Sequence, residues 1–204
     1  MFYKFEREID MKIRVLVPIA DGSEEIESVT VVDILRRAGV DVFVSAVTSS
    51  NTREITASRG VKIVADDVIS NSIDEMWDAI VLPGGIDGAK HLAESKILDK
   101  ILIKHISEKK VIAAICASPC TVLGDKGFLT NHIATCHPHF HSSLKCRELD
   151  AESRVVVDDH YITSQGPGTA IDFALEIVEM LCGVVKREEV ASPLVLTTST
   201  TSYY

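Results

Sequence analysis

Short apolar runs alternate with helical patterns along most of the chain. Continuous aliphatic residues predict buried strands over Lys12–Ile19, Val40–Val47, Asp78–Leu82 and Val111–Ile115. Apolar positions that recur every three or four residues predict helices over Ser23–Ala38, Ala89–Glu94, Ile97–Glu108 and Thr169–Leu181. Strands that alternate with helices form a mostly parallel sheet covered on both faces. The pattern therefore predicts an α/β fold whose ligands bind at the carboxyl ends of the strands.

Shorter signals fill the rest of the chain. Two short strands separated by a turn predict a hairpin, over Glu54–Ala57 and Val61–Ala65. Three more short strands and a last helical turn are predicted at Ile133–Cys136, Val155–Val157, Tyr161–Thr163 and Lys186–Val190. No internal repeat or linker interrupts the series. We therefore expect a single domain over residues 12–196, an N-terminal extension of residues 1–11 and a C-terminal tail of residues 197–204.

Cys116 lies where the Val111–Ile115 strand ends and a helix is expected to begin. Ser118 supplies a capping hydroxyl, and Pro119 suits the first position of a helix. Backbone N–H groups at a helix start favour a thiolate, so this strand–turn–helix position suits a cysteine nucleophile. The alternative is that Cys116 is a small buried hydrophobic residue, as many free cysteines are.

Glu27 occupies a position where a charged side chain is unexpected. At helical spacing it lies in line with Val31, Ile34 and Leu35, on the face that should contact the sheet. A carboxyl group buried there must be paired or protonated, and a nearby thiolate raises its pKa further. A protonated Glu27 can donate a hydrogen bond to sulfur or act as a general acid and base. The alternative is an ordinary helix-end acid that turns toward water.

Val29 and Val32 form a second apolar stripe on the same helix, beside Glu25 and Arg36. A helix that is apolar on two sides is expected to have its outer face covered as well. We therefore predict a homodimer contact through this first helix, with cover by the chain's own tail as the alternative.

Two glycine-containing segments also carry candidate chemistry. Gly84 and Gly85 follow the Asp78–Leu82 strand, and glycine allows a ligand to approach backbone N–H groups closely. Such N–H groups are what an oxyanion or aldehyde-oxygen site requires. Neither this segment nor Gly166-Pro167-Gly168 has the pattern of a dinucleotide or phosphate loop, and the second is expected to be a tight turn.

The segment Cys136-His137-Pro138-His139-Phe140-His141 is the one that resembles a set of metal ligands. Zinc sites pair such residues at spacings that close a tetrahedron, and no second half-site is evident in the sequence. No metal is therefore predicted. His137 instead can reach the thiol from the end of its strand as a proton-transfer partner, or it lies exposed to solvent.

Composition narrows the classes of protein to consider. The 204 residues carry a net charge of −9, and no cluster of Lys and Arg is dense enough to bind a phosphate backbone. Nucleic acid is therefore not expected as the main partner, and no apolar run is long enough to span a membrane. Five cysteines without framework spacing suit a reducing compartment. We expect a cytoplasmic location, or an organelle if residues 1–11 are the remnant of a precursor.

Several segments together resemble the ThiJ/PfpI superfamily. Within it, they resemble the subgroup of the Parkinson's-disease-associated protein deglycase (DJ-one) and its bacterial and plant relatives. The resemblance runs from about Lys12 to Leu196 in one order and with few gaps. Its motifs are Gly22-Ser23-Glu24-Glu25-Ile26-Glu27, Leu35-Arg36-Arg37-Ala38-Gly39, Ser58-Arg59-Gly60, Leu82-Pro83-Gly84-Gly85, Ala113-Ala114-Ile115-Cys116-Ala117 and Thr163-Ser164-Gln165-Gly166-Pro167-Gly168-Thr169.

The resemblance implies a flavodoxin-like three-layer α/β/α sandwich and a homodimer. It implies a nucleophilic Cys116, a protonated Glu27 and a third catalytic residue at His137, with an oxyanion site at Gly85 and the N–H of Ala117. It implies a glutathione-independent glyoxalase (glyoxalase III) or a protein deglycase that acts on methylglyoxal, glyoxal and their adducts. Redox sensing through cysteine oxidation and chaperone behaviour are also implied. No metal or organic cofactor is expected.

Two positions depart from the family pattern. The protease-like branch carries His directly after the nucleophile, where this chain has Ala117. A cysteine peptidase is therefore the weakest of the functions considered. Cys120 is unusual for the subgroup and lies about one helical turn after Cys116, so as a hypothesis it acts as a resolving thiol.

Two functions remain open on the sequence, and both use the same residues. In the first, the Cys116 thiolate adds to an aldehyde, and Glu27, helped by His137, moves protons between adjacent carbons. In the second, Cys116 is oxidised to a sulfinate that Glu27 stabilises by a hydrogen bond, and the oxidised form signals or binds partners.

Overall fold

A parallel sheet forms the centre of the molecule, as the alternation of apolar runs predicts. The structure, a computed structural model, describes residues 12–196, so the predicted extension and tail lie outside the described residues. The seven strands follow the order β10-β11-β7-β6-β1-β2-β5. All neighbouring pairs are parallel except β10 with β11. Their bounds are β1 (Arg14–Ile19), β2 (Asp41–Ala46), β5 (Asp67–Val68), β6 (Ala79–Leu82), β7 (Val111–Ile115), β10 (Val155–Asp158) and β11 (Tyr161–Ser164).

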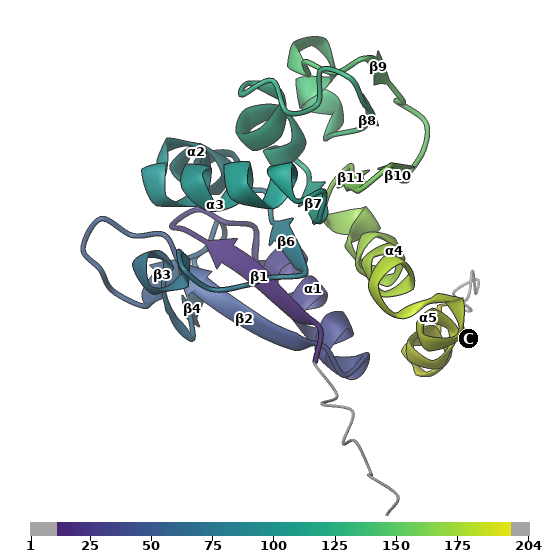
Figure 1. The fold of residues 1–204 in the computed structure, drawn as a ribbon, viewed down its shortest axis with the longest axis horizontal. Coiled ribbons are helices and arrows are strands. Elements are labelled where there is room, and N and C mark those ends of the chain that lie inside the picture. Colours follow the sequence, from purple (N-terminus) through teal and green to yellow (C-terminus); the bar gives the residue numbers. More distant parts are fainter. Residues whose placement is uncertain (1–11, 197–204) are drawn as a thin grey trace, which may run out of the picture.

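Helices cover both faces of this sheet, which confirms the flavodoxin-like three-layer architecture (Figure 1). The helices α1 (Glu25–Arg37) and α4 (Ala170–Cys182) pack together on one face, and α5 (Val184–Ala191) packs on α4. The helices α2 (Ile86–Glu94) and α3 (Lys96–Ser107) cover the other face. Successive strand residues point to opposite faces, so Val15 and Val17 pack with α1 and α4, whereas Leu16 packs with α2 and α3.

Two small strand pairs lie outside the central sheet. The predicted hairpin is confirmed, with β3 (Glu54–Thr56) antiparallel to β4 (Lys62–Val64). The strands β8 (Ile133–Ala134) and β9 (Glu148–Leu149) form a parallel pair. The pattern did not predict β5 or β9, which have two residues each, one of them acidic. The equally short β8 was predicted because it begins the segment Ile133–Cys136, which has no charged residue.

The starts of two helices differ from their prediction. Ser23 does not cap α1, because its hydroxyl accepts a hydrogen bond from the N–H of Ala20 at 2.9 Å. Glu24 is the cap instead, and its carboxylate accepts from the N–H of Glu27 at 2.8 Å. Ser118 makes no capping bond, because its hydroxyl donates to the carbonyl of Pro83, and the segment that follows is the π-helix η2 (Pro119–Gly124).

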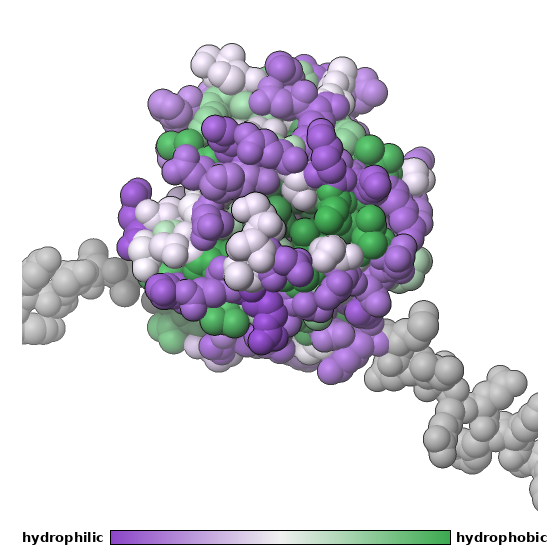
Figure 2. Space-filling view, turned by 90° about the vertical axis from the view of Figure 1, so that its left-hand side faces the viewer, coloured by the Kyte–Doolittle hydropathy of each residue, from purple (hydrophilic) through white to green (hydrophobic). Residues whose placement is uncertain are grey.

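The outer surface is mostly hydrophilic, and hydrophobic residues gather at only a few places on the face seen in Figure 2. The longest helices have 13 residues. Within residues 12–196, none of the helices combines the length and the apolar character needed to cross a membrane.

Two adjacent residues on α3 provide a test of this packing. Leu102 is fully buried against the sheet, whereas Ile103 is 57% exposed. We expect Leu102→Ala to lower the free energy of unfolding by about 2–5 kcal/mol, because it removes buried contacts and leaves a cavity. Ile103→Ala should change it by less than about 0.5 kcal/mol. Urea titrations followed by circular dichroism measure both, and equal losses would contradict the burial of Leu102.

Candidate active site

Cys116 lies on a sharp turn directly after β7, as the strand–helix junction predicts. Its φ angle is +66°, a left-handed conformation that is rare outside glycine and that typically costs about 1–3 kcal/mol. Two backbone hydrogen bonds hold the turn: the N–H of Cys116 donates to Ser164, and the carbonyl of Cys116 accepts from His137. The turn directs the half-buried thiol into a cleft beside the carboxyl ends of the strands.

Glu27 is fully buried on the inner face of α1, which confirms the helical-wheel prediction. One of its oxygens, Oε2, accepts a hydrogen bond from the N–H of Gly84 at 2.7 Å. Its other oxygen, Oε1, has no hydrogen-bond partner among the residues that the structure describes. Burial, together with the negative charge of Glu24, raises the pKa of Glu27 to about 7. This carboxyl group therefore holds a proton that an exposed glutamate would lose.

Gly84 allows the side chains of Glu27 and Cys116 to lie close together. A Cβ atom at this position would stand 2.5 Å from the Cβ of Cys116 and 2.7 Å from Oε2 of Glu27. Both groups thus lie against the same point of the β6–α2 loop, so any side chain there would push them apart.

The pKa of Cys116 depends on the state of Glu27. Burial is the largest cause that raises the pKa of Cys116 to about 12, and the charge of Glu27 is the next. The N–H groups of Gly85 and Ala117 lower it, in the direction that the sequence predicts, but burial and Glu27 outweigh them. When Glu27 is protonated its charge is removed and its proton can be donated to sulfur, so the thiolate forms most readily beside the neutral acid.

The predicted oxyanion residues lie beside the thiol. The N–H groups of Gly85 and Ala117 both act on the Cys116 sulfur, so the structure brings these three residues together. Gly85 has a φ angle of +84°, and a Cβ atom there would stand 2.1 Å from the carbonyl oxygen of Gly22. Only glycine fits this position, and Gly85 lines the cleft together with Cys116.

His137 is hydrogen-bonded to Cys116 through its backbone, and its side chain lines the same cleft. Its Nδ1 accepts a hydrogen bond from the N–H of His139 at 3.2 Å, so the neutral ring carries its proton on Nε2. A Cβ atom at Gly166 would stand 3.3 Å from Cδ2 of the His137 ring. Gly166 therefore leaves space for the imidazole, a role that the tight-turn prediction did not include.

The cleft has a volume of ≈ 640 Å³. It contains Cys116 and His137, and it also contains residues that the sequence did not single out as site residues. These come from several connecting segments: Glu24, Ser58, Arg59, Ile86, Asp87, His139, Phe140 and Pro167. Their spacing along the chain carries no pattern, so only the fold could reveal that they share one site.

The chain is similar to known proteins over most of its length. Residues 13–180 match the DJ-1/PfpI family. The chain belongs to the DJ-1/PfpI family. It is 40% identical over 183 residues to protein DJ-1 homolog B of Arabidopsis thaliana, an alignment that covers 90% of this chain and 41% of the plant protein. The chain thus spans less than half the length of that relative.

Two other members of the DJ-1/PfpI family are similar over nearly their whole length. The glutathione-independent glyoxalase DJR-1.2 of Caenorhabditis elegans is 36% identical over 185 residues, which cover 89% of this chain and 95% of that protein. The structure of oxidized Toxoplasma gondii DJ-1 superimposes with a TM-score of 0.86 at 40% identity, covering 90% of this chain and 98% of the other.

The remaining cysteines lie beyond the cleft. Cys136 is buried, and its thiol faces the carbonyl of His137 at 3.6 Å. Within residues 12–196, no group of three or more His, Cys, Asp or Glu side chains is arranged to hold a metal ion. Cys120 is buried on η2, and burial, followed by the negative charge of Asp125, raises the pKa of its thiol. Its pairing with Cys116 stays a prediction.

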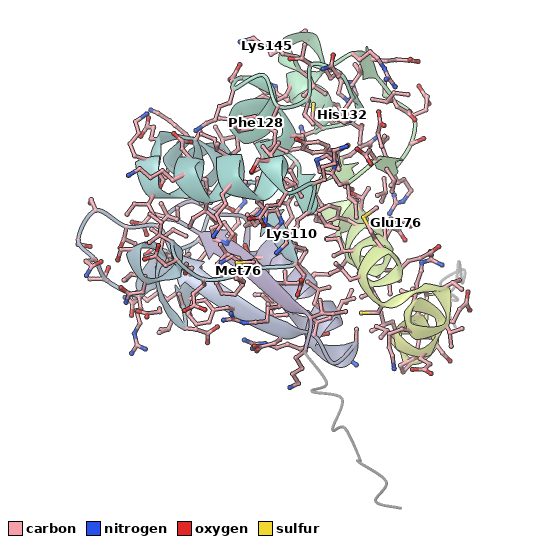
Figure 3. The ribbon with its side chains drawn as sticks, viewed as in Figure 1. Met76, Lys110, Phe128, His132, Lys145 and Glu176 are labelled. Carbon is pink, nitrogen blue, oxygen red and sulfur yellow. The ribbon has the colours of Figure 1, made fainter. Side chains whose placement is uncertain are left out.

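The segment from η2 to β9 lies above the sheet in the view of Figure 3, where Phe128, His132 and Lys145 are labelled, and its buried residues share the core of α2 and α3. Met76 and Lys110 lie lower in that view, in the part of the chain that precedes β7. His137 comes from the same upper segment, so the cleft joins this segment to the ends of the parallel strands.

The raised pKa of Glu27 makes stability depend on pH. Between pH 4.5 and about 7 the folded protein holds a proton that the unfolded chain has lost, so its free energy of unfolding falls as the pH rises. Glu27→Gln cannot ionise, so its stability relative to the native protein should rise by up to about 3 kcal/mol across this window.

Urea titrations at pH values from 4.5 to 8 measure this difference. Glu94→Gln, which changes an exposed glutamate on α2, is the matched control and should show no such trend. A difference between Glu27→Gln and the native protein that stays constant with pH would contradict the raised pKa.

Proposed function

We propose that this chain is a glutathione-independent glyoxalase and protein deglycase that uses Cys116 as its nucleophile. The observation that carries the proposal is the buried Glu27, whose pKa is raised to about 7, against the thiol in an open cleft. A general acid and base is most effective when its pKa is near the working pH. The name of the Caenorhabditis elegans relative supports the same reaction for this chain.

The reaction begins with addition of the Cys116 sulfur to the aldehyde carbon of methylglyoxal or glyoxal. A carbon–sulfur bond forms, and the aldehyde oxygen becomes the hydroxyl of a hemithioacetal. The N–H groups of Gly85 and Ala117 can stabilise negative charge on that oxygen during the addition. Thiol and carboxyl together supply the one proton that the oxygen takes up.

A proton transfer between two carbons then completes the redox change within the substrate. Glu27 removes the proton from the former aldehyde carbon and returns one to the neighbouring carbon, so the first carbon is oxidised and the second reduced. His137, with its proton on Nε2, can donate to the oxygen of the second carbon and recover a proton from the hydroxyl of the first carbon, which becomes the thioester carbonyl. Water hydrolyses the resulting thioester, which releases lactate or glycolate and restores the thiol. In an adduct on a protein amine or thiol, the Cys116 sulfur displaces that nitrogen or sulfur from the former aldehyde carbon. The released amine or thiol takes up the Cys116 thiol proton, and the same hemithioacetal then follows the steps above.

Turnover of methylglyoxal tests this proposal directly. We expect the reduced protein, without glutathione or added metal, to produce lactate. Cys116→Ser and Glu27→Gln should each lower kcat by at least about 100-fold, because they remove the nucleophile and the proton carrier. His137→Ala should lower kcat by less. An enzymatic lactate assay with stopped samples measures the rates, and Cys136→Ser is the matched cysteine control.

Undiminished turnover by Cys116→Ser would assign the chemistry to another residue. Absence of turnover by the native protein would favour the second candidate function, a redox-responsive protein in which peroxide oxidises Cys116 to a sulfinate. The related Toxoplasma gondii structure, which is described as oxidized, supports this candidate. Intact mass after peroxide treatment distinguishes added oxygen on Cys116 from the loss of two hydrogens that a Cys116–Cys120 disulfide produces.

We also propose that the protein is a homodimer through α1. Val29 is 54% exposed on this helix and Val64 is 64% exposed on β4. Both line a shallow depression of ≈ 330 Å³, together with Val32 and Ile63. Large apolar side chains grouped in this way on a helix and a neighbouring hairpin are typical of a contact surface.

Light scattering tests the dimer. The native protein should have twice the chain mass of 22.3 kDa, and Val29→Glu should shift the population toward the monomer because it places a charge in an apolar contact. Val184→Glu, at a similarly exposed valine on α5, is the control and should leave the mass unchanged. A mass of one chain across a wide range of protein concentrations would contradict the dimer.

A further inference from the structure

The cleft is larger than the small aldehydes of the proposed reaction require. Its volume of ≈ 640 Å³ falls within the range of about 300–1,000 Å³ that is typical of sites for drug-sized ligands. Methylglyoxal would occupy only the part next to Cys116. The remaining space is lined by side chains that the chemistry does not use. Some are polar, among them Arg59, Asp87 and His139, and three larger ones are apolar: Ile86, Phe140 and Pro167.

Ile86 is the most unusual of these side chains. It is the first residue of α2, directly follows Gly85 of the oxyanion site, and is 68% exposed although it lines the cleft. A large aliphatic side chain that is exposed beside a nucleophile is not explained by packing of the core. Binding of a ligand whose apolar part covers Ile86 would remove this surface from water, which is energetically favourable.

Pro167 is a second apolar side chain beside Cys116, and the order of strands in the sheet explains its position relative to Ile86. In the sheet, β7 lies between β6 and β11. Cys116 follows β7, Ile86 follows the loop after β6, and Pro167 follows the loop after β11. These two residues therefore approach the cleft from the strands on either side of the nucleophile.

Phe140 is fixed to the same site by a short series of backbone hydrogen bonds. The N–H of His137 donates to the carbonyl of Cys116, and the N–H of Phe140 donates to the carbonyl of His137 at 2.8 Å. The Phe140 ring meets the His139 ring edge to face, with centroids 5.2 Å apart. An aromatic group in the cleft could extend this arrangement, because rings favour edge-to-face and offset contacts.

We propose that Ile86, Phe140 and Pro167 form an apolar subsite that selects 2-oxoaldehydes with an aryl-sized group on the ketone carbon. The inference rests on the proposed function and names the substrate class of that site. Phenylglyoxal is the simplest probe, and addition of water converts it to mandelate. Its aldehyde carbon is oxidised and its ketone carbon reduced, with the proton carried by Glu27, so no external oxidant or reductant takes part.

The test compares initial rates with phenylglyoxal and methylglyoxal as the two substrates. In the native protein, kcat/KM should be higher for phenylglyoxal. In Ile86→Ala, the ratio of kcat/KM for phenylglyoxal to kcat/KM for methylglyoxal should fall about tenfold. Loss of an apolar contact of this size is worth roughly 1–3 kcal/mol in discrimination between two substrates. Ile103→Ala, at an isoleucine of similar exposure on α3, is the matched control and should leave the ratio unchanged.

Phe140 provides a second and independent variant. It is partly buried against the core, so a thermal melt must show that Phe140→Ala is still folded. If it is not, Phe140→Leu replaces it, because leucine keeps most of the apolar volume. Loss of the aromatic ring should lower the ratio in both variants. A native protein that turns over methylglyoxal but whose ratio is unchanged in Ile86→Ala and both Phe140 variants would overturn the subsite and leave the proposed function standing.

Product binding tests the subsite without turnover. By calorimetry, mandelate should bind the native protein more tightly than lactate does, and Ile86→Ala should remove most of the difference. If neither aldehyde is turned over, the proposed function fails, and this measurement decides the subsite alone. Equal affinity for mandelate and lactate would then overturn it.

Discussion

The lack of space between the β6 loop and the turn after β7 determines the arrangement of the whole site. At Gly84 the acid from α1, the sulfur-bearing residue after β7 and a backbone carbonyl all lie within 3 Å of the place where a side chain would begin. The backbone N–H of the same glycine holds the carboxyl group of Glu27. One residue without a side chain therefore joins three elements that are far apart in the sequence.

This crowding also explains why the site disfavours its own charged forms. The carboxyl group is enclosed by the sheet and α1, and the thiol lies beside it, so ionisation of one opposes ionisation of the other. The left-handed backbone of Cys116 in addition lowers the stability of the folded protein. Hydrophobic cores on both faces of the sheet stabilise the fold, and most of their residues lie away from the cleft.

The order of strands and helices could be predicted from the sequence because it depends on local apolar patterns. The burial of Glu27 and the place of Cys116 could also be predicted, since each follows from the position of one residue on one element. The residues that cap the helices could not be predicted from the sequence. Ser23 and Ser118 have the right chemistry for a cap, but tertiary contacts with Ala20 and Pro83 use their hydroxyl groups. The side chains around the cleft were missed for a similar reason, because their meeting depends on the order of strands in the sheet.

The structure separates the reacting groups from those that surround them. Cys116 and Glu27 are set by regular elements, whereas Ile86, Phe140 and Pro167 belong to the connections at the open end of the sheet. Mutations in such connections are tolerated more readily than mutations in the core. Substitutions in these connections can therefore change the lining of the cleft while the elements that hold Cys116 and Glu27 stay the same.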